Sequence, residues 1–156
     1  MKWRYSATQV CAALNEESAR YLVIGGIACI LHGYVRATTD VDILVERSAE
    51  NIRRVLDALS AVGYGFAKEF TVEDILAKPI TIIGDDPAVD IFQVAWSVKY
   101  DQAVDRSSVV EVDGVRIPLI GLDDLIATKR TGRPLDTADV EALEEIRRLR
   151  GGAPAP

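Results

Sequence analysis

The sequence has few of the residues that most often build disulfide, thiolate-metal or base-catalytic sites. Its 156 residues include one histidine, His32, and two cysteines, Cys11 and Cys29. The cysteines have no metal-ligand spacing and fall in predicted helices, so we expect reduced thiols in the core. His32 follows a Gly-Gly pair on a predicted helix, and we expect it to be a packed or hydrogen-bonded residue rather than a base.

Long apolar runs are also absent. No stretch of the sequence approaches the roughly 20 apolar residues that cross a membrane, so no membrane partner is expected. Residues 1–10 contain no apolar segment of signal-peptide length. This absence predicts a cytoplasmic protein.

Basic residues are outnumbered by acidic ones. Eighteen lysines and arginines face 24 aspartates and glutamates, which gives a net charge of −6. Broad non-specific affinity for nucleic acid needs a basic face, so this balance argues against it. A local basic rim stays open, formed by Arg36, Lys129, Arg130 and Arg133.

The remaining composition is that of a globular chain. About half of the residues are apolar and about a quarter are charged, and the length suits one domain with a sizeable core. We expect a single domain over 1–150 and a disordered tail over 151–156. Trp3 and Trp96 are interpreted as packing residues.

Apolar periodicity and turn residues place the main elements. Stripes with helical spacing predict helices over 122–131 and after caps at Ser6, Ser48 and Asp136. Apolar runs rich in β-branched or aromatic residues predict strands over 21–24, 43–45, 64–66, 80–83 and 88–92. Asp113-Gly114 is a favoured type I′ pair, which predicts a hairpin over 109–118 with Glu111 opposite Arg116.

The stretch over 21–45 carries the most informative pattern. A polar turn leads into Asp40-Val41-Asp42 at the start of an apolar run. Residues two apart in a strand share a face, so Asp40 and Asp42 project together. Two parallel carboxylates at the start of a buried strand are costly without a cation. The pattern therefore predicts a magnesium site; the alternative is a turn aspartate followed by a solvated edge-strand aspartate.

Gly25 and Gly26 allow two interpretations. At the start of a helix their N–H groups are open to an anion and would cradle a phosphate. The alternative is a tight strand–helix turn that needs a positive φ. The spacing is not GxGxxG and no ribose-binding acid follows about 20 residues later, so a dinucleotide site is not indicated. An anion cradle beside a carboxylate pair suits a nucleoside triphosphate that carries magnesium.

Two further positions leave alternatives open. Asp90 is a lone carboxylate in the apolar run 88–92. It would hold a metal and help to take a proton from an attacking hydroxyl, or it is an edge-strand charge that discourages aggregation. Thr38 and Thr39 would bond a phosphate or cap the turn before the strand.

These residues together resemble the nucleotidyltransferase superfamily that shares the DNA polymerase β-type fold. The resemblance rests on Gly25-Gly26, then Asp40-x-Asp42, then Asp90 on a later strand. Arg36 and Thr38 match the R-x-T-x-D-x-D form of small bacterial and archaeal members, which include minimal nucleotidyltransferases and the toxins of abortive-infection and toxin–antitoxin pairs. The downstream segment DLIATKRTGRPLDTADVEAL is also similar to that group.

The resemblance implies a fold and a set of site residues. The fold is α/β (α+β), a small mixed sheet with helices packed mainly on one face. Asp40, Asp42 and Asp90 are implied as catalytic residues and as ligands of two Mg²⁺ ions. The implied triphosphate-binding residues are Gly25, Gly26, Arg36, Thr38, Lys129 and Arg133. Asp136 and Asp139 are interpreted as residues that stabilise the last helix.

The implied activity is transfer of a nucleoside monophosphate from an NTP to an acceptor hydroxyl, with release of pyrophosphate. The acceptor stays open between tRNA, a protein and a small molecule, and an antitoxin or a second subunit is a candidate partner. Two other interpretations stay open. One is a nucleotide-binding module without catalysis, and the other is an interaction subunit that keeps the fold and works through a partner.

Overall fold

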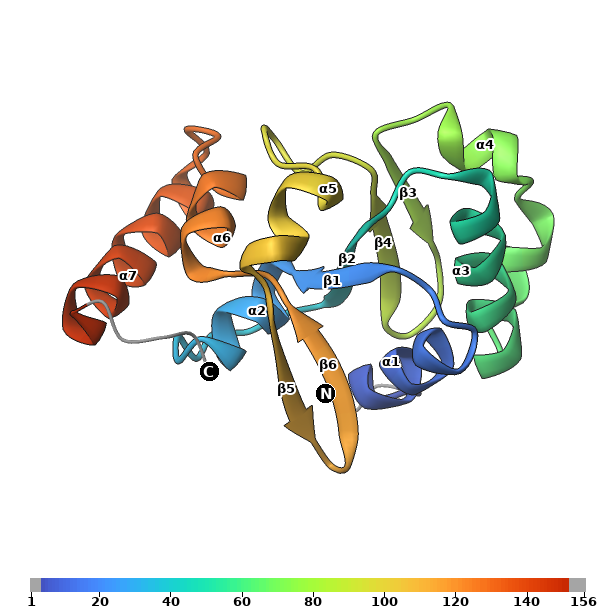
Figure 1. Ribbon diagram of the computed structural model, residues 1–156, viewed down its shortest axis with the longest axis horizontal. Helices are drawn as coiled ribbons and strands as arrows, with labels where there is room; N and C mark the ends of the chain where they lie inside the picture. Colours follow the sequence, from blue (N-terminus) through green and yellow to red (C-terminus); the bar gives the residue numbers. More distant parts are fainter. Residues whose placement is uncertain (1–3, 152–156) are drawn as a thin grey trace.

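A six-stranded mixed sheet forms the centre of the protein (Figure 1). The computed structural model describes residues 4–151. The strands are β1 (Tyr21–Ile24), β2 (Asp40–Val45), β3 (Ile80–Ile83), β4 (Ala88–Phe92), β5 (Ser108–Val112) and β6 (Val115–Leu119). Their order in the sheet is β3-β4-β2-β1-β6-β5. The pairs β2–β4 and β1–β6 are parallel and the others are antiparallel, which confirms the predicted mixed sheet.

Helices surround this sheet (Figure 1). They are α1 (Ala7–Glu16), α2 (Gly25–Leu31), α3 (Ala49–Val62), α4 (Val72–Leu76), α5 (Tyr100–Ala103), α6 (Leu122–Thr128) and α7 (Pro134–Arg150), with 3-10 turns η1 (Gly65–Glu69) and η2 (Val104–Arg106). The helices α1 and α3 pack together at one end of the molecule, and α6 packs on α7 at the other. Among residues 4–151, no helix combines the length and apolarity needed to cross a membrane.

Alternation along β2 and β4 decides which side chains face the core. The buried positions are Val41, Ile43, Val89 and Ile91. Because successive side chains point to opposite faces of a strand, Asp40, Asp42 and Asp90 lie on the other face, where all three are half-buried. The core therefore closes one face of this strand pair and leaves the carboxylates on the face that is less covered.

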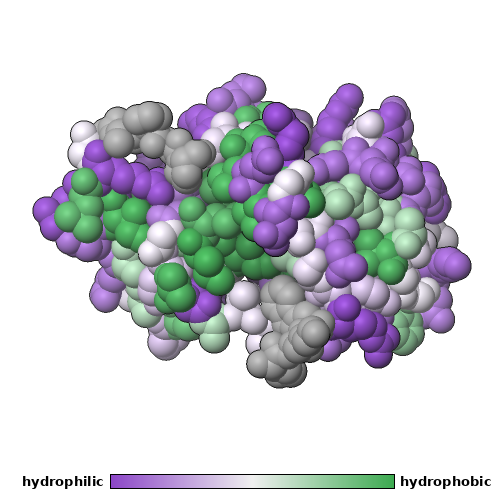
Figure 2. Space-filling view, turned by 90° about the horizontal axis from the view of Figure 1, so that it is seen from below, coloured by the Kyte–Doolittle hydropathy of each residue, from purple (hydrophilic) through white to green (hydrophobic). Residues whose placement is uncertain are grey.

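The hairpin of β5 and β6 has the predicted register. Glu111 is opposite Arg116, and Val112 is opposite Val115. The turn residues Asp113 and Gly114 have φ values of 50° and 77°, which is the geometry that the Asp-Gly pair favours. The hairpin projects from the body of the molecule in Figure 1. Seen from that side, apolar surface gathers in the middle of the molecule, where α2 and the hairpin lie (Figure 2).

One predicted element is wrong, and two predictions fall outside the described residues. The segment from Tyr64 to Phe66 is not a strand, because η1 begins at Gly65. Its side chains do not alternate as a strand needs: the buried Tyr64 donates a hydrogen bond to the Pro87 carbonyl (2.7 Å), and Phe66 is exposed. Trp3 and the predicted tail lie outside the described residues, apart from Gly151 at the end of α7.

The lone histidine and the cysteines are structural, as predicted. His32 is buried, and its Nε2 lies 2.7 Å from the Ile120 carbonyl oxygen. Burial lowers the pKa of His32, so the neutral imidazole is favoured. Cys11 and Cys29 are free, buried thiols, and burial raises the pKa of Cys11 to about 11.

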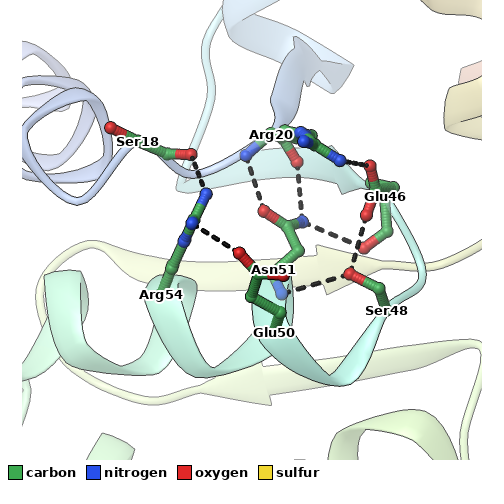
Figure 3. Close-up of polar contacts among 7 residues, drawn as sticks. All are labelled: Ser18, Arg20, Glu46, Ser48, Glu50, Asn51 and Arg54. Atoms are coloured by element: carbon green, nitrogen blue, oxygen red, sulfur yellow. Dashed lines mark hydrogen bonds and ion pairs between the residues drawn. The ribbon is translucent and has the colours of Figure 1, made fainter.

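Asn51 ties α3 to the ends of β1 and β2 (Figure 3). Its side chain accepts a hydrogen bond from the Arg20 N–H (2.7 Å) and donates to the carbonyls of Arg20 and Glu46 (both 2.9 Å). Arg20 precedes β1 and Glu46 follows β2. One buried amide thus satisfies three backbone groups at the point where the antiparallel pair meets the helix.

We predict that Asn51→Ala lowers the free energy of unfolding by about 1–3 kcal/mol, because it removes three hydrogen bonds to partly buried backbone groups. Urea unfolding measures the change. The control is Glu50→Ala on the same helix turn, which removes an exposed ion pair to Arg54 and an acidic residue from the first turn of α3 and should change stability by no more than about 1 kcal/mol. Equal losses in the two variants would contradict this role of Asn51.

Candidate active site

One cleft contains every residue that the resemblance assigned to the site. Its volume is about 880 Å³. The predicted residues in its lining are Gly25, Gly26, Arg36, Thr38, Asp40, Asp42, Asp90, Lys129 and Arg133. They come from α2, the loop before β2, the strands β2 and β4, and the segment between α6 and α7. Arg130 of the candidate basic rim does not line this cleft and pairs with Glu144. The fold therefore gathers residues more than 100 positions apart in the sequence into one place.

The carboxylates of Asp40, Asp42 and Asp90 form a cluster that fits a cation. Each offers an oxygen, and these oxygens lie within 4.8 Å of one another. The parallel register of β2 and β4 sets Asp42 directly beside Asp90. Oδ1 of Asp42 and Oδ1 of Asp90 are buried and have no hydrogen-bond partner among the described residues. Buried carboxylate oxygens without partners are costly, and an oxygen-preferring divalent cation would satisfy them.

Burial and mutual repulsion raise the pKa values of two carboxyl groups in this cluster, Asp42 and Asp90. Burial, followed by the negative charge of Asp90, raises the pKa of Asp42 to about 7. Burial and the charge of Asp40 likewise raise the pKa of Asp90. Lys129 opposes the shift at Asp42. Without a bound cation, Asp42 therefore keeps its proton up to near-neutral pH, and a cation would compete with that proton.

The glycine pair leaves room for two polar side chains of the cleft. Gly25 has a φ of +67°, and a Cβ there would lie 2.0 Å from Oδ2 of Asp42. A Cβ on Gly26 would lie 2.7 Å from Oγ1 of Thr38. The tight-turn interpretation of the pair is thus correct for Gly25. The two glycines are the first residues of α2, and the side chain of the preceding Ile24 does not cap their N–H groups. The phosphate-cradle interpretation is therefore compatible with the same geometry.

Two cations of the cleft share one buried carboxylate. Oδ2 of Asp139 lies 3.0 Å from Nη1 of Arg36 and 2.9 Å from Nζ of Lys129. The Asp139 side chain is fully buried, and those of Lys129 and Arg36 are 10% and 19% exposed. Charges at this depth need a partner. Asp139 therefore orients both cations along one wall of the cleft and offsets part of their charge.

The predicted cap of the last helix is wrong, because α7 begins at Pro134 with Arg133 as its N-cap. Asp136 falls inside the first turn and has a different set of partners. It accepts hydrogen bonds from the Thr131 hydroxyl (2.6 Å) and from Nε of Arg133 (2.8 Å), and it lies 3.8 Å from Nζ of Lys129. Asp136 and Asp139 thus organise the basic segment before α7 rather than only stabilising the helix.

Sequence reasoning missed the role of Asp139 and the apolar part of the cleft. Asp139 precedes Leu143 by one helical turn, and Leu143 is fully buried on α7. An aspartate on the apolar face of a helix is a signal for a buried ion pair. Trp96 was expected to be a packing residue, but it is 63% exposed and lines the cleft.

We predict that Asp139→Ala lowers the free energy of unfolding by about 3–5 kcal/mol, since it leaves Arg36 without its partner and leaves Lys129 only the more distant Asp136. The control is Asp123→Ala, which breaks an exposed pair with Arg147 and should cost no more than about 1 kcal/mol. Chemical denaturation of both variants tests the difference. A loss in Asp139→Ala as small as that of the control would show that the buried pairs do not support the fold.

The cleft and the fold have counterparts among known proteins. Residues 6–150 match the family described as "Nucleotidyltransferase of unknown function (DUF6036)". No curated protein matches the sequence.

Solved structures with the same fold share little sequence with this chain. An antigenic nucleotidyltransferase-like protein from Paracoccidioides brasiliensis has a TM-score of 0.57 and 17% identity, over 91% of this chain and 73% of that one. The lincosamide antibiotic adenylyltransferase LnuA, solved with lincomycin, has a TM-score of 0.54 and 15% identity, over 90% and 98% of the two chains. ANT(2")-Ia, solved with adenylyl-2"-tobramycin, has a TM-score of 0.51 and 15% identity, over 92% and 91%.

These matches agree with the resemblance inferred from Gly25-Gly26, Asp40-x-Asp42 and Asp90. The family match spans nearly the whole described chain, and the structural neighbours share its fold. An NTP-dependent transfer of a nucleoside monophosphate is the general activity of such proteins. The chain belongs to the nucleotidyltransferase family that matches residues 6–150.

Proposed function

We propose that this protein is a Mg²⁺-dependent nucleotidyltransferase that moves a nucleoside monophosphate from an NTP to the hydroxyl of a small-molecule acceptor. The observation that carries the proposal is the cluster of Asp40, Asp42 and Asp90 with its unpartnered buried oxygens. The structural neighbours solved with lincomycin and with adenylyl-2"-tobramycin support a small molecule as the acceptor.

The basic wall of the cleft would hold the triphosphate. Arg36 and Lys129 lie on this wall, and Asp139 fixes their positions. Arginine grips phosphate oxygens with two parallel hydrogen bonds, and lysine acts as a point charge. The N–H groups of Gly25 and Gly26 and the hydroxyl of Thr38 border the same space and would bind the β- and γ-phosphates. Arg133 lies at the exposed margin of the cleft, where its side chain is 75% exposed.

The carboxylates of Asp40, Asp42 and Asp90 would hold the two Mg²⁺ ions. When bound, Mg²⁺ neutralises charge that develops on the α-phosphate and on the leaving pyrophosphate. The acceptor oxygen forms a bond to the α-phosphorus while the bond to the bridging oxygen of pyrophosphate breaks. Asp90 accepts the proton of the acceptor hydroxyl.

Other features of the proposal remain predictions from the sequence. These are the single domain over 1–150, a cytoplasmic location and a partner antitoxin or second subunit. A tRNA or protein acceptor is a separate outcome of the transfer experiment described below. The presence of all three carboxylates in one cleft favours catalysis over a nucleotide-binding module without activity.

We predict that Asp42→Asn stabilises the metal-free protein at pH 8. The pKa of Asp42 is raised to about 7 in the folded state, above its ordinary value, so the wild type is most stable when Asp42 is protonated. Its stability should fall as the pH rises from about 4 to about 7. Asparagine removes the repulsion, and we expect a gain on the order of 1–3 kcal/mol at pH 8, because one pKa unit corresponds to about 1.4 kcal/mol.

Thermal unfolding in EDTA and in Mg²⁺ tests this prediction. Mg²⁺ should stabilise the wild type at pH 8 and leave Asp42→Asn unchanged. Asp57→Asn is the matched control, because Asp57 is exposed on α3 outside the cleft, and it should respond to Mg²⁺ as the wild type does. An equal Mg²⁺ response in wild type and Asp42→Asn would refute the metal site.

We further predict that purified protein with Mg²⁺ and an α-labelled NTP transfers label to an acceptor. Total cellular RNA, a protein extract and a small-molecule extract are tested separately, with each of the four NTPs. Asp42→Ala should reduce transfer at least about 100-fold, which corresponds to about 2.7 kcal/mol of transition-state stabilisation, and Asp57→Asn should retain it. Transfer by Asp42→Ala at the wild-type rate would refute the assignment. Label in the RNA or the protein fraction alone would replace the small-molecule acceptor.

A further inference from the structure

The cleft continues past the carboxylates into an apolar wall. We define the apolar wall as Ile80, Ile82, Phe92 and Trp96. The described part of the chain has eight large apolar side chains that are exposed, and three of them belong to this wall. Exposed apolar side chains that gather in a concave surface indicate a binding site, whereas apolar side chains scattered singly over a surface do not.

Local structure holds this wall open toward the cleft. On β3, Thr81 and Ile83 face the core, while Ile80 and Ile82 are 44% and 60% exposed. Trp96 occupies a tight turn in which Ala95 and Val98 exchange backbone hydrogen bonds (2.9 and 3.0 Å). The φ of Trp96 is +56°, an uncommon value for a residue other than glycine. A strained backbone that presents an exposed tryptophan to a cleft is typical of a functional position.

The sheet order fixes where this wall lies relative to the other parts of the cleft. Ile82 is opposite Asp90, and Ile80 is opposite Phe92 in the β3–β4 pairing. Since β3 and β1 lie on opposite sides of the β4–β2 pair, Ile80 and Ile82 of the apolar wall and Gly25, which follows β1, flank the carboxylates from opposite sides. The cleft thus runs from the glycines, across the carboxylates, to the apolar wall.

If the protein has the proposed function, the position of the apolar wall indicates which substrate it contacts. In phosphoryl-type transfer the attacking and leaving oxygens lie roughly in line with the phosphorus. If pyrophosphate leaves on the side of Gly25, Arg36 and Lys129, the acceptor hydroxyl must enter from the opposite side. That side begins at Asp90, the proposed proton acceptor, and continues along β3.

We propose that the apolar wall binds the body of the acceptor, and that the acceptor is a small, uncharged, largely apolar compound with a hydroxyl group. The side chains of the wall carry no formal charge. Arg133, an exposed cation of the cleft lining, is paired with Asp136 at 2.7 Å. A polycationic acceptor would need carboxylates that the metal site does not use, and the wall offers none. An aromatic or alicyclic alcohol would pack its apolar body on these side chains and present its hydroxyl to Asp90.

Fluorescence titration with 2-naphthol tests this inference, because the probe is apolar, uncharged at pH 7.5 and carries one hydroxyl. The protein is first saturated with Mg²⁺ and an α,β-methylene NTP analogue. We expect 2-naphthol to bind the wild type, and its Kd to rise at least about tenfold, or about 1.4 kcal/mol, in the double variant Ile80→Thr and Trp96→Ala. Both positions are exposed, so the fold should be retained.

Phe66→Ala is the matched control, because Phe66 is 57% exposed on η1 and outside the cleft. It should leave the Kd of 2-naphthol unchanged within about twofold, and all variants should bind the NTP analogue as the wild type does. Failure of 2-naphthol to bind, equal effects in control and double variant, or tighter binding of the polycation kanamycin would overturn the apolar acceptor.

The nucleotide titration separates the two proposals. If the wild type binds no NTP analogue in the presence of Mg²⁺, the proposed function fails, whatever the result with 2-naphthol. If the analogue binds the wild type but loses affinity in the double variant while 2-naphthol does not, the wall holds the nucleobase instead of the acceptor, and only the acceptor inference is overturned.

Discussion

The repulsion among Asp40, Asp42 and Asp90 is the constraint on which the site depends. The parallel register of β2 and β4 forces these charges together, and core packing on the opposite face of the strands holds that register. A slip of one residue would turn the carboxylates into the core and the buried valines and isoleucines toward the cleft. The free energy of apolar burial therefore maintains a charge cluster that would otherwise separate.

Two positive charges of the cleft, Arg36 and Lys129, lie on its basic wall. Lys129 and Arg36 would gain from pairing directly with the aspartates of β2, and such pairing would fill the cleft with internal ion pairs. Asp139 holds both cations instead. Because the cations already have a partner, they stay at a fixed place beside the carboxylates without collapsing onto them. Because Asp139 holds these cations, the space between them and the three aspartates of the cluster stays accessible to a charged ligand.

Local sequence patterns predicted the features that depend on short-range chemistry. The capping box at Ser6, the Asp-Gly hairpin and the common face of Asp40 and Asp42 all follow from spacing along the chain. The grouping of the predicted site residues in one cleft agrees with the resemblance. Partners distant in sequence could not be predicted in this way. Asp139 meets Arg36 across 103 positions, and only the packing of α7 beside the cleft brings them together.

The exposure of Trp96 also depends on tertiary structure, because the same aromatic residue could equally have filled the core. Its turn, with a positive φ, points it into the cleft instead.

The edge position of β3 separates the residues that stabilise the core from the residues that shape the cleft. Thr81 and Ile83 anchor this strand in the core, while Ile80 and Ile82 contribute to the cleft with little burial. Substitutions at the two exposed positions change the surface of the cleft without creating cavities in the interior. Members of such a family can therefore diverge in ligand preference along one edge strand while the metal-binding strands and the core beneath them stay the same.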